Sequence, residues 1–193
     1  MKYYILRHED VSGEFIDGEV SFHPSIEGYY QIGKSVVSAG TVVKVKLDKP
    51  IKKMNSDFFF TTSGAFFVSD KMRKVLEKHR TLAEFYDADV QYFGGRGVEG
   101  EYYFIHVSCK IPCFDYLNSE YSGKAMILDR ISKGELSSDY SVRGIKKMRV
   151  VEGETLGLDF FFVENVIWVD PIVTESVVVS AKAEKLNLNI EEI

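Results

Sequence analysis

The sequence predicts an α+β fold with mixed, mainly antiparallel sheets and two principal helices. Strand-like runs dominate the chain, which is rich in the aromatic residues that fill sheet cores, with 14 Phe and 11 Tyr. Only two segments carry a clear helix signal. The length of 193 residues corresponds to about one domain of ~150 residues. We expect a single domain, 1–193, in which a β-rich part (1–56) packs on an α+β part (57–193).

The first 56 residues contain two strand-like runs. Lys2 to Leu6 is a short run of aromatic and β-branched residues, and Thr41 to Leu47 places apolar and lysine side chains alternately. Such a period of two is typical of a half-buried strand. Between these runs, residues 11–38 carry four glycines, which indicates loops with short strands.

A helix is predicted over Ser69 to Arg80. Its apolar side chains fall at the spacing i, i+3, i+4 and i+7, beginning at Met72, and Ser69 or Asp70 is suited to the N-cap. The next run, Ala83 to Phe93, has strand character. Glycines in residues 94–100 then form a turn into Tyr102 to Cys109, so the two runs predict a hairpin.

The final third predicts further strands and the second helix. The strands are Ala125 to Leu128, Ile145 to Val151, Leu158 to Val163, Val166 to Val169 and, at the end, Leu186 to Ile190. Asp170-Pro171 combines an N-cap residue with a proline suited to the first helical position, which predicts a helix from Pro171 to Lys185. The three consecutive valines at 177–179 are a competing strand signal.

The charge of the chain argues against nucleic acid as a partner. The net charge is −5, and residues 81–193 hold 11 basic and 19 acidic side chains. Such a field attracts basic partners and repels phosphate, although a solvated acidic face is the plainer explanation. No apolar run reaches the ~20 residues that span a bilayer, and the N-terminus lacks a signal-peptide pattern. We expect a cytoplasmic protein with no membrane association.

Motifs for catalysis and metal binding are absent from the sequence. The four histidines and two cysteines show no metal-ligand spacing, no serine lies in a nucleophile elbow, and no Lys-Ser or Lys-Thr pair follows Gly94-Gly95-Arg96-Gly97. We therefore expect no metal and no cofactor. One enzymatic alternative stays open: Asp87 and Asp89 share a strand face and could act as the acidic pair of a small hydrolase or sugar-processing enzyme.

The segment from Tyr102 to Ser119 has a distinctive order of residues. Two adjacent tyrosines open an apolar strand, and Cys113, Asp115 and Ser119 follow it. Short polar side chains at these positions suit a local turn, in which they bond free backbone N–H groups.

This segment resembles a family of bacterial polymorphic-toxin immunity proteins, the eleventh numbered immunity family, formerly a domain of unknown function. The resemblance covers most of the chain from about residue 57 onward, and one further match lies near the N-terminus. The matching positions are Tyr3 to Leu6, Phe66 to Ser69, Tyr102 to Ile105, Cys113 with Asp115 and Ser119, and Val166 to Asp170. The chain departs from the family pattern at 116–118, and at Asp170-Pro171 where the family has a serine and an acid.

The resemblance implies a cytoplasmic, non-enzymatic protein that binds a cognate secreted toxin and blocks it, protecting the producing cell. From the acidic charge we expect a basic toxin and stoichiometric occlusion by an acidic, tyrosine-bearing surface. The expected contact residues are Asp87, Asp89, Tyr92, Glu99, Glu101, Glu152, Glu154, Asp159 and Glu164. Self-association through an unpaired sheet edge is a further alternative, and monomer and dimer both stay open.

Overall fold

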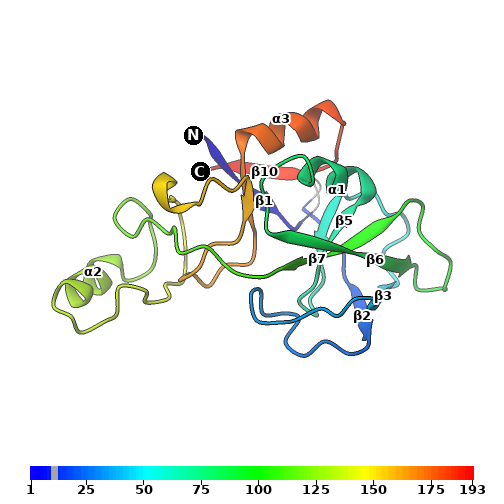
Figure 1. Ribbon diagram of the computed structural model, residues 1–193, viewed down its shortest axis with the longest axis horizontal. Coiled ribbons are helices and arrows are strands. Elements are labelled where there is room, and N and C mark those ends of the chain that lie inside the picture. The colour runs from blue at the N-terminus through cyan, green and yellow to red at the C-terminus, as the bar shows by residue number, and fades with distance from the viewer. Residues whose placement is uncertain (10–12) are drawn as a thin grey trace.

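The structure, a computed structural model, describes residues 1–9 and 13–193, and in them the chain forms two β-sheets and three α-helices (Figure 1). The four-stranded sheet has the order β10-β1-β9-β8 and comprises β1 (Tyr3–Arg7), β8 (Phe160–Phe161), β9 (Ile172–Thr174) and β10 (Asn189–Glu192). The six-stranded sheet has the order β2-β3-β6-β7-β5-β4 and comprises β2 (Gly18–His23), β3 (Val42–Leu47), β4 (Phe58–Phe60), β5 (Phe66–Ser69), β6 (Ala83–Gln91) and β7 (Tyr102–Val107). The helices are α1 (Asp70–Leu76), α2 (Lys124–Ser132) and α3 (Glu175–Ala183), with a 3₁₀ turn, η1 (Glu152–Glu154).

The predicted fold class is confirmed. Among the described residues, the strand pairs are antiparallel except β3 with β6, which is parallel. The alternation in β3 is also confirmed, since Val43, Val45 and Leu47 are buried and Lys44 and Lys46 are exposed. The predicted hairpin is β6 with β7. Of the loop region expected at 11–38, residues 11 and 12 lie outside the described part of the chain, and β2 is its one regular strand in the part described.

The two sheets share a central core with α1 and α3. Met72 and Leu76 of α1 and Val177 of α3 are fully buried in it, together with side chains from both sheets. The helix α1 begins where the sequence predicts, because the Ser69 hydroxyl accepts a hydrogen bond from the Met72 N–H at 3.3 Å. It ends at Leu76, four residues earlier than Arg80.

The outer faces of the sheets are covered differently. N-terminal loops cover the six-stranded sheet, with Ile16 and Met54 packed on β3 and β5. The other side of the four-stranded sheet is covered by a largely irregular segment, residues 111–168, which carries α2. Figure 1 shows α2 at one end of the molecule and the turn after β6 at the other.

Three of the predicted strands were wrong. Ala125 to Leu128 lies inside α2, whose lysine, alanine, methionine and leucine are good helix formers, and a short apolar run does not distinguish strand from helix. Ile145 to Val151 and Val166 to Val169 are extended chain with isolated bridges, such as Val142 with Val166. No continuous strand forms there, because the neighbouring segments are also irregular and pair with these residues only through single bridges.

The second helix does not begin at Pro171. Asp170 is buried and bonds to Arg7 and His8 in place of capping a helix, and the residues after Pro171 form β9 between β1 and β8. The helix α3 starts at Glu175. The valines at 177–179 are helical because burial of two of them in the central core outweighs their strand propensity.

Strands of the first 56 residues enter both sheets, since β1 lies in the four-stranded sheet and β2 and β3 lie in the six-stranded sheet. We propose on this basis that the chain folds as one unit. The two termini lie side by side in Figure 1, where β10 pairs with β1. Among the described residues, no helix is both long and apolar enough to cross a membrane.

Candidate functional site

The hairpin β6–β7 carries part of the predicted acidic surface on the face of the sheet that also carries α1. Asp87 and Asp89 alternate with inward-facing residues of β6 and are exposed. In the strand register, Tyr103 of β7 lies opposite Asp87 and Lys44 of β3 lies opposite Asp89. Both carboxylates therefore stand on an open sheet surface, not in a cleft where they could converge on a substrate.

Tyr103 lies at the centre of this surface. The Arg73 guanidinium of α1 sits 4.5 Å from the centre of the Tyr103 ring. Burial raises the pKa of Tyr103, Arg73 lowers it, and the negative charges of Glu101, Asp70 and Asp87 raise it again, so that the pKa lies above its usual value. We call the surface formed by Asp87, Asp89, Glu101 and Tyr103 the acidic sheet face.

The carboxylates of this face have few internal partners. Within the described residues, the side chains of Asp87 and Glu101 have no hydrogen bond or ion pair, and Asp89 accepts a hydrogen bond only from the amide of Gln91, at 2.8 Å. Arg73, in contrast, is held by Asp70 at 2.8 Å and by Glu77 at 2.6 Å. The acidic sheet face thus offers charges that a partner can use.

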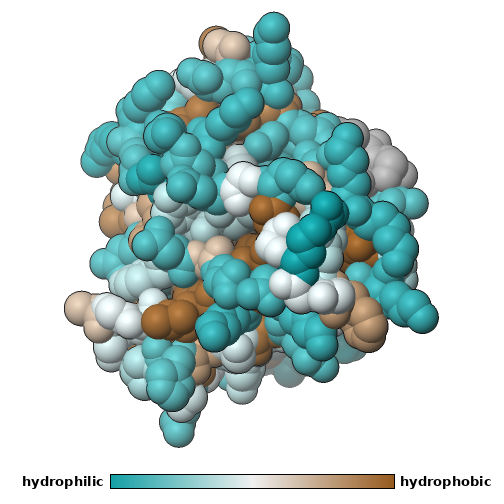
Figure 2. Space-filling view, turned by 90° about the vertical axis from the view of Figure 1, so that its right-hand side faces the viewer, coloured by the Kyte–Doolittle hydropathy of each residue, from teal (hydrophilic) through white to brown (hydrophobic). Residues whose placement is uncertain are grey.

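Tyr92 and Glu99, also expected to contact a partner, are held by the protein itself. Tyr92 is only 7% exposed; its hydroxyl accepts from the Met54 N–H at 3.0 Å and donates to Glu99 at 2.9 Å. This bond is the main cause that lowers the pKa of Glu99. Tyr92 is therefore a core residue, whereas Tyr103, opposite Asp87 in the strand register, is the tyrosine of the acidic sheet face. Figure 2 views this end of the molecule and shows a largely hydrophilic surface with small apolar patches.

The acidic residues of the final third do not form one surface. Glu152 pairs with the N-terminal amine at 2.7 Å, and Glu154 is exposed on the same 3₁₀ turn. Glu164 borders a cavity on another side of the irregular segment. Asp159 accepts hydrogen bonds from the Arg80 N–H at 3.0 Å and the Thr174 hydroxyl at 2.7 Å. It is therefore engaged in the fold, and it is not free to contact a partner.

Asp159 belongs to a chain of polar contacts that joins the turn after α1 to α3. His79 lies 3.7 Å from Asp159 through Nδ1 and 2.9 Å from the Ser180 hydroxyl through Nε2. Burial raises the pKa of Asp159, but hydrogen bonds from Thr174, Arg80 and Ser176 outweigh it, and the pKa is lowered. The order of groups is that of a hydrolytic triad, but the Asp–His separation exceeds a hydrogen bond and the serine lies in the middle of a helix. The contacts serve helix packing.

Cys113, Asp115 and Ser119 lie in a turn that is bonded to the strand-like segment at Arg149. The Asp115 carboxylate accepts the Asn118 N–H at 3.0 Å, and the Ser119 hydroxyl both accepts from the Arg149 N–H at 2.9 Å and donates to its carbonyl at 3.2 Å. Cys113 is fully buried, and burial raises the pKa of its thiol to about 12. The polar side chains of Asp115 and Ser119 are thus hydrogen-bonded within the protein itself.

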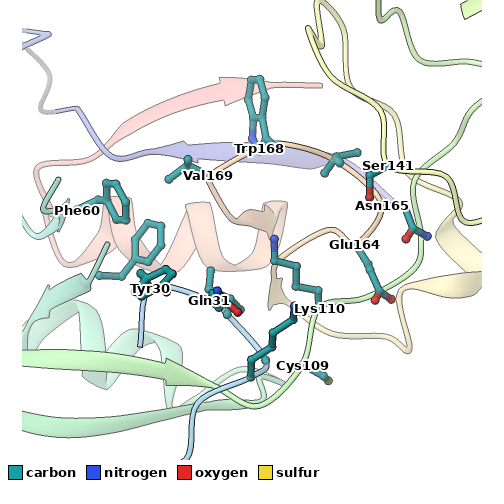
Figure 3. Close-up of a pocket in the computed structure, with 15 residues that line it drawn as sticks. Tyr30, Gln31, Phe60, Cys109, Lys110, Ser141, Glu164, Asn165, Trp168 and Val169 are labelled. Atoms are coloured by element: carbon teal, nitrogen blue, oxygen red, sulfur yellow. The ribbon is translucent and has the colours of Figure 1, made fainter. Parts of the chain in front are cut away.

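Cys109, unlike Cys113, is exposed. It borders a cavity of about 570 Å³ between residues 30–34, 109–110 and 164–169. Figure 3 shows side chains from all three segments around the opening. Sequence reasoning identified Glu164 but not the other lining residues, because segments more than 50 positions apart meet there. Among the described residues, no group of three or more His, Cys, Asp or Glu side chains is arranged to hold a metal ion.

Comparison with known families identifies the class of protein. The immunity protein family (Imm11) matches residues 30–187, and the chain belongs to this family. Its members are immunity proteins, which neutralise a toxin without acting as enzymes. A search of curated proteins finds no match to the chain.

Proposed function

We propose that the protein neutralises its toxin by stoichiometric occlusion, with the acidic sheet face covering a basic surface of the toxin. The observation that carries the proposal is the pair of unpartnered carboxylates, Asp87 and Glu101, on either side of Tyr103. A toxin that acts on nucleic acid or another polyanion carries basic groups at its substrate groove, and an acidic cover competes for that groove.

The surface is suited to rapid and specific association. Carboxylates on a strand that is hydrogen-bonded on both sides, as β6 is by β3 and β7, are held in place before binding, which lowers the entropic cost of the complex. Complementary charges mainly accelerate association and set specificity, while an aromatic side chain such as Tyr103 adds contact area. Lys44, opposite Asp89, gives the face a position where a toxin carboxylate would be tolerated.

The same proposal places the encounter in the cytoplasm of the producing cell, with one immunity protein for each toxin molecule and no nucleic acid in the complex. The hydrolase alternative loses its basis, because Asp87 and Asp89 stand on an exposed strand. Self-association through a sheet edge has no specific support, and light scattering of the purified protein distinguishes monomer from dimer.

Charge reversal tests the binding face. We expect the variant Asp87→Lys with Glu101→Lys to associate with the toxin at least tenfold more slowly at low salt, and to lose most of the salt dependence of the association rate. A matched control, Glu27→Lys with Glu184→Lys, makes the same change in net charge at exposed positions outside the face. Stopped-flow mixing at several salt concentrations measures both.

Two results would contradict the proposal. If the sheet-face variant and the control associate equally fast, the acidic sheet face does not bind the toxin. A variant of the second acidic group, Glu152→Lys with Glu154→Lys, shows whether that group is used instead. If toxin activity in a titration is abolished well below one equivalent of immunity protein, inhibition is not stoichiometric and the occlusion mechanism is wrong.

A further inference from the structure

We propose that the cavity between residues 30–34, 109–110 and 164–169 binds a monoanion on an apolar body, such as the carboxylate of an aromatic acid. The inference is independent of the acidic sheet face, which lies at the other end of β7. It rests on an unpartnered ammonium group, on the charge balance around it and on the apolar wall of the cavity.

The ammonium group is that of Lys110, the third residue after β7. Figure 3 shows its side chain extending into the space between Tyr30 and Trp168. Its ammonium has no hydrogen bond and no ion pair within the described residues, although the side chain is half-buried. A partly desolvated cation without a partner is costly, and an anion in the cavity would remove this cost.

The charges near Lys110 favour a single negative charge on the ligand. Burial lowers the pKa of Lys110, Glu164 raises it, and Lys34 lowers it, so both of these side chains lie within electrostatic reach. Two ammonium groups and one carboxylate leave one uncompensated positive charge. A monoanion neutralises it, whereas the further negative charges of a polyphosphate would find no positive partner among these three groups.

The wall opposite Lys110 is apolar and aromatic. Tyr30, which is 58% exposed, Phe60 and Phe66 line one side, and Val169, which is 41% exposed, lines another. The volume of about 570 Å³ lies in the range of small-molecule sites, 300–1,000 Å³. The ligand therefore combines a charged end for Lys110 with a body that packs on the rings. The acid could be a free metabolite or an acidic side chain beside an apolar one on the toxin.

The only tryptophan of the chain, Trp168, lines the cavity and supplies the signal for a test. The probe is 3-phenylpropionate, and its neutral analogue is 3-phenylpropionamide. We expect the acid to change Trp168 emission in a saturable way and to bind about tenfold more tightly than the amide. In Lys110→Met, affinity for the acid should fall about tenfold to the level of the amide, whereas the matched variant Lys78→Met, at an exposed lysine of the α1 region, should bind like the wild type.

Equal binding of acid and amide by the wild-type protein, or no saturable change up to ~10 mM probe, overturns the proposal, and neither result depends on whether Lys110→Met folds. An unchanged affinity in a folded Lys110→Met variant overturns it as well. Repeating the titration on the toxin complex identifies the source of the natural anion. Exclusion of the probe by the toxin indicates a toxin side chain, and retained binding indicates a free acid. The toxin-free titrations stand even if the acidic sheet face proves not to bind the toxin.

Discussion

Replacement of Asp170 by Asn should destabilise the protein, because the buried Asp170 carboxylate bonds to Arg7 and His8 at the end of β1. Asp170 is 4% exposed, accepts from Arg7 Nη1 at 3.1 Å and from the His8 backbone N–H at 3.0 Å, and bonds to the His8 ring. Asparagine keeps the shape and one acceptor oxygen but loses the negative charge. The variant therefore removes two charge-assisted contacts without leaving a cavity.

The expected loss of stability is about 3 kcal/mol. A hydrogen bond to a charged group contributes about 1.5–3 kcal/mol, and partial exposure of the Arg7 and His8 side chains, 26% and 19%, favours the lower value for each. Arg7 is not left unpaired, because its Nε donates to Glu191 at 3.0 Å. The loss should therefore stay below the 3–5 kcal/mol range seen when a buried charge is orphaned.

Part of this loss should depend on pH. The hydrogen bond to Asp170 raises the pKa of His8, and burial of the ring opposes it only in part. A raised pKa means that the stabilisation is fully present below the unfolded-state pKa of about 6.5 and is lost as pH rises through the folded-state pKa. The difference between wild type and Asp170→Asn should fall from about 3 kcal/mol near pH 5.5 to about half that value near pH 9.

Urea unfolding followed by Trp168 fluorescence measures this difference, since the indole lies 5.1 Å from the Arg7 guanidinium. The control is Asp129→Asn, which removes an exposed ion pair between Asp129 of α2 and Lys133 just after the helix, and it should cost less than about 0.5 kcal/mol at either pH. An Asp170→Asn variant as stable as the control would refute the reasoning. A constant difference between pH 5.5 and pH 9 would refute the role of His8.

Two further substitutions test the packing around the cavity and the turn. Gly64→Ala should destabilise the protein by about 2 kcal/mol or more, because a Cβ at position 64 would lie 2.3 Å from the Cβ of Tyr30. The control, Gly95→Ala, has a similar positive φ but open space around it, and it should cost only about 1 kcal/mol. Equal losses of stability in thermal unfolding would contradict the steric argument. Ser119→Ala should cost about 1–3 kcal/mol in urea unfolding, because it removes the fully buried hydroxyl that accepts from the half-buried Arg149 N–H. An unchanged unfolding midpoint would show that the turn does not need the hydroxyl.

Local patterns in the sequence were sufficient for the elements whose partners lie close in the chain. The β6–β7 hairpin, the alternation of β3 and the Ser69 cap of α1 each follow from a few neighbouring residues. The same reasoning misplaced the start of α3, because Asp170 and Pro171 form a good helix-start signal on local grounds. In the structure the Asp170 carboxylate instead bonds to Arg7 and His8, which lie more than 160 residues away in the sequence.

The candidate site shows the same division. Period-two alternation places Asp87 and Asp89 on one exposed face, and the structure has them there. Alternation also places Tyr102 and Tyr103 on opposite faces of β7, a signal that could have identified Tyr103. Alternation does not predict that Tyr92 is buried, or that the Asp159 carboxylate accepts hydrogen bonds from Arg80 and Thr174, because these contacts join separate segments.

By itself, the sequence determined the α+β class, the acidic character of the C-terminal part and the family to which the chain belongs. These properties depend on composition, short-range periodicity and local order of residues. The tertiary structure alone decided which carboxylates are free, which are consumed by the fold, and that Lys110 enters a cavity with aromatic walls. The physical reason is that the exposure and charge of a side chain depend on segments that meet only after folding.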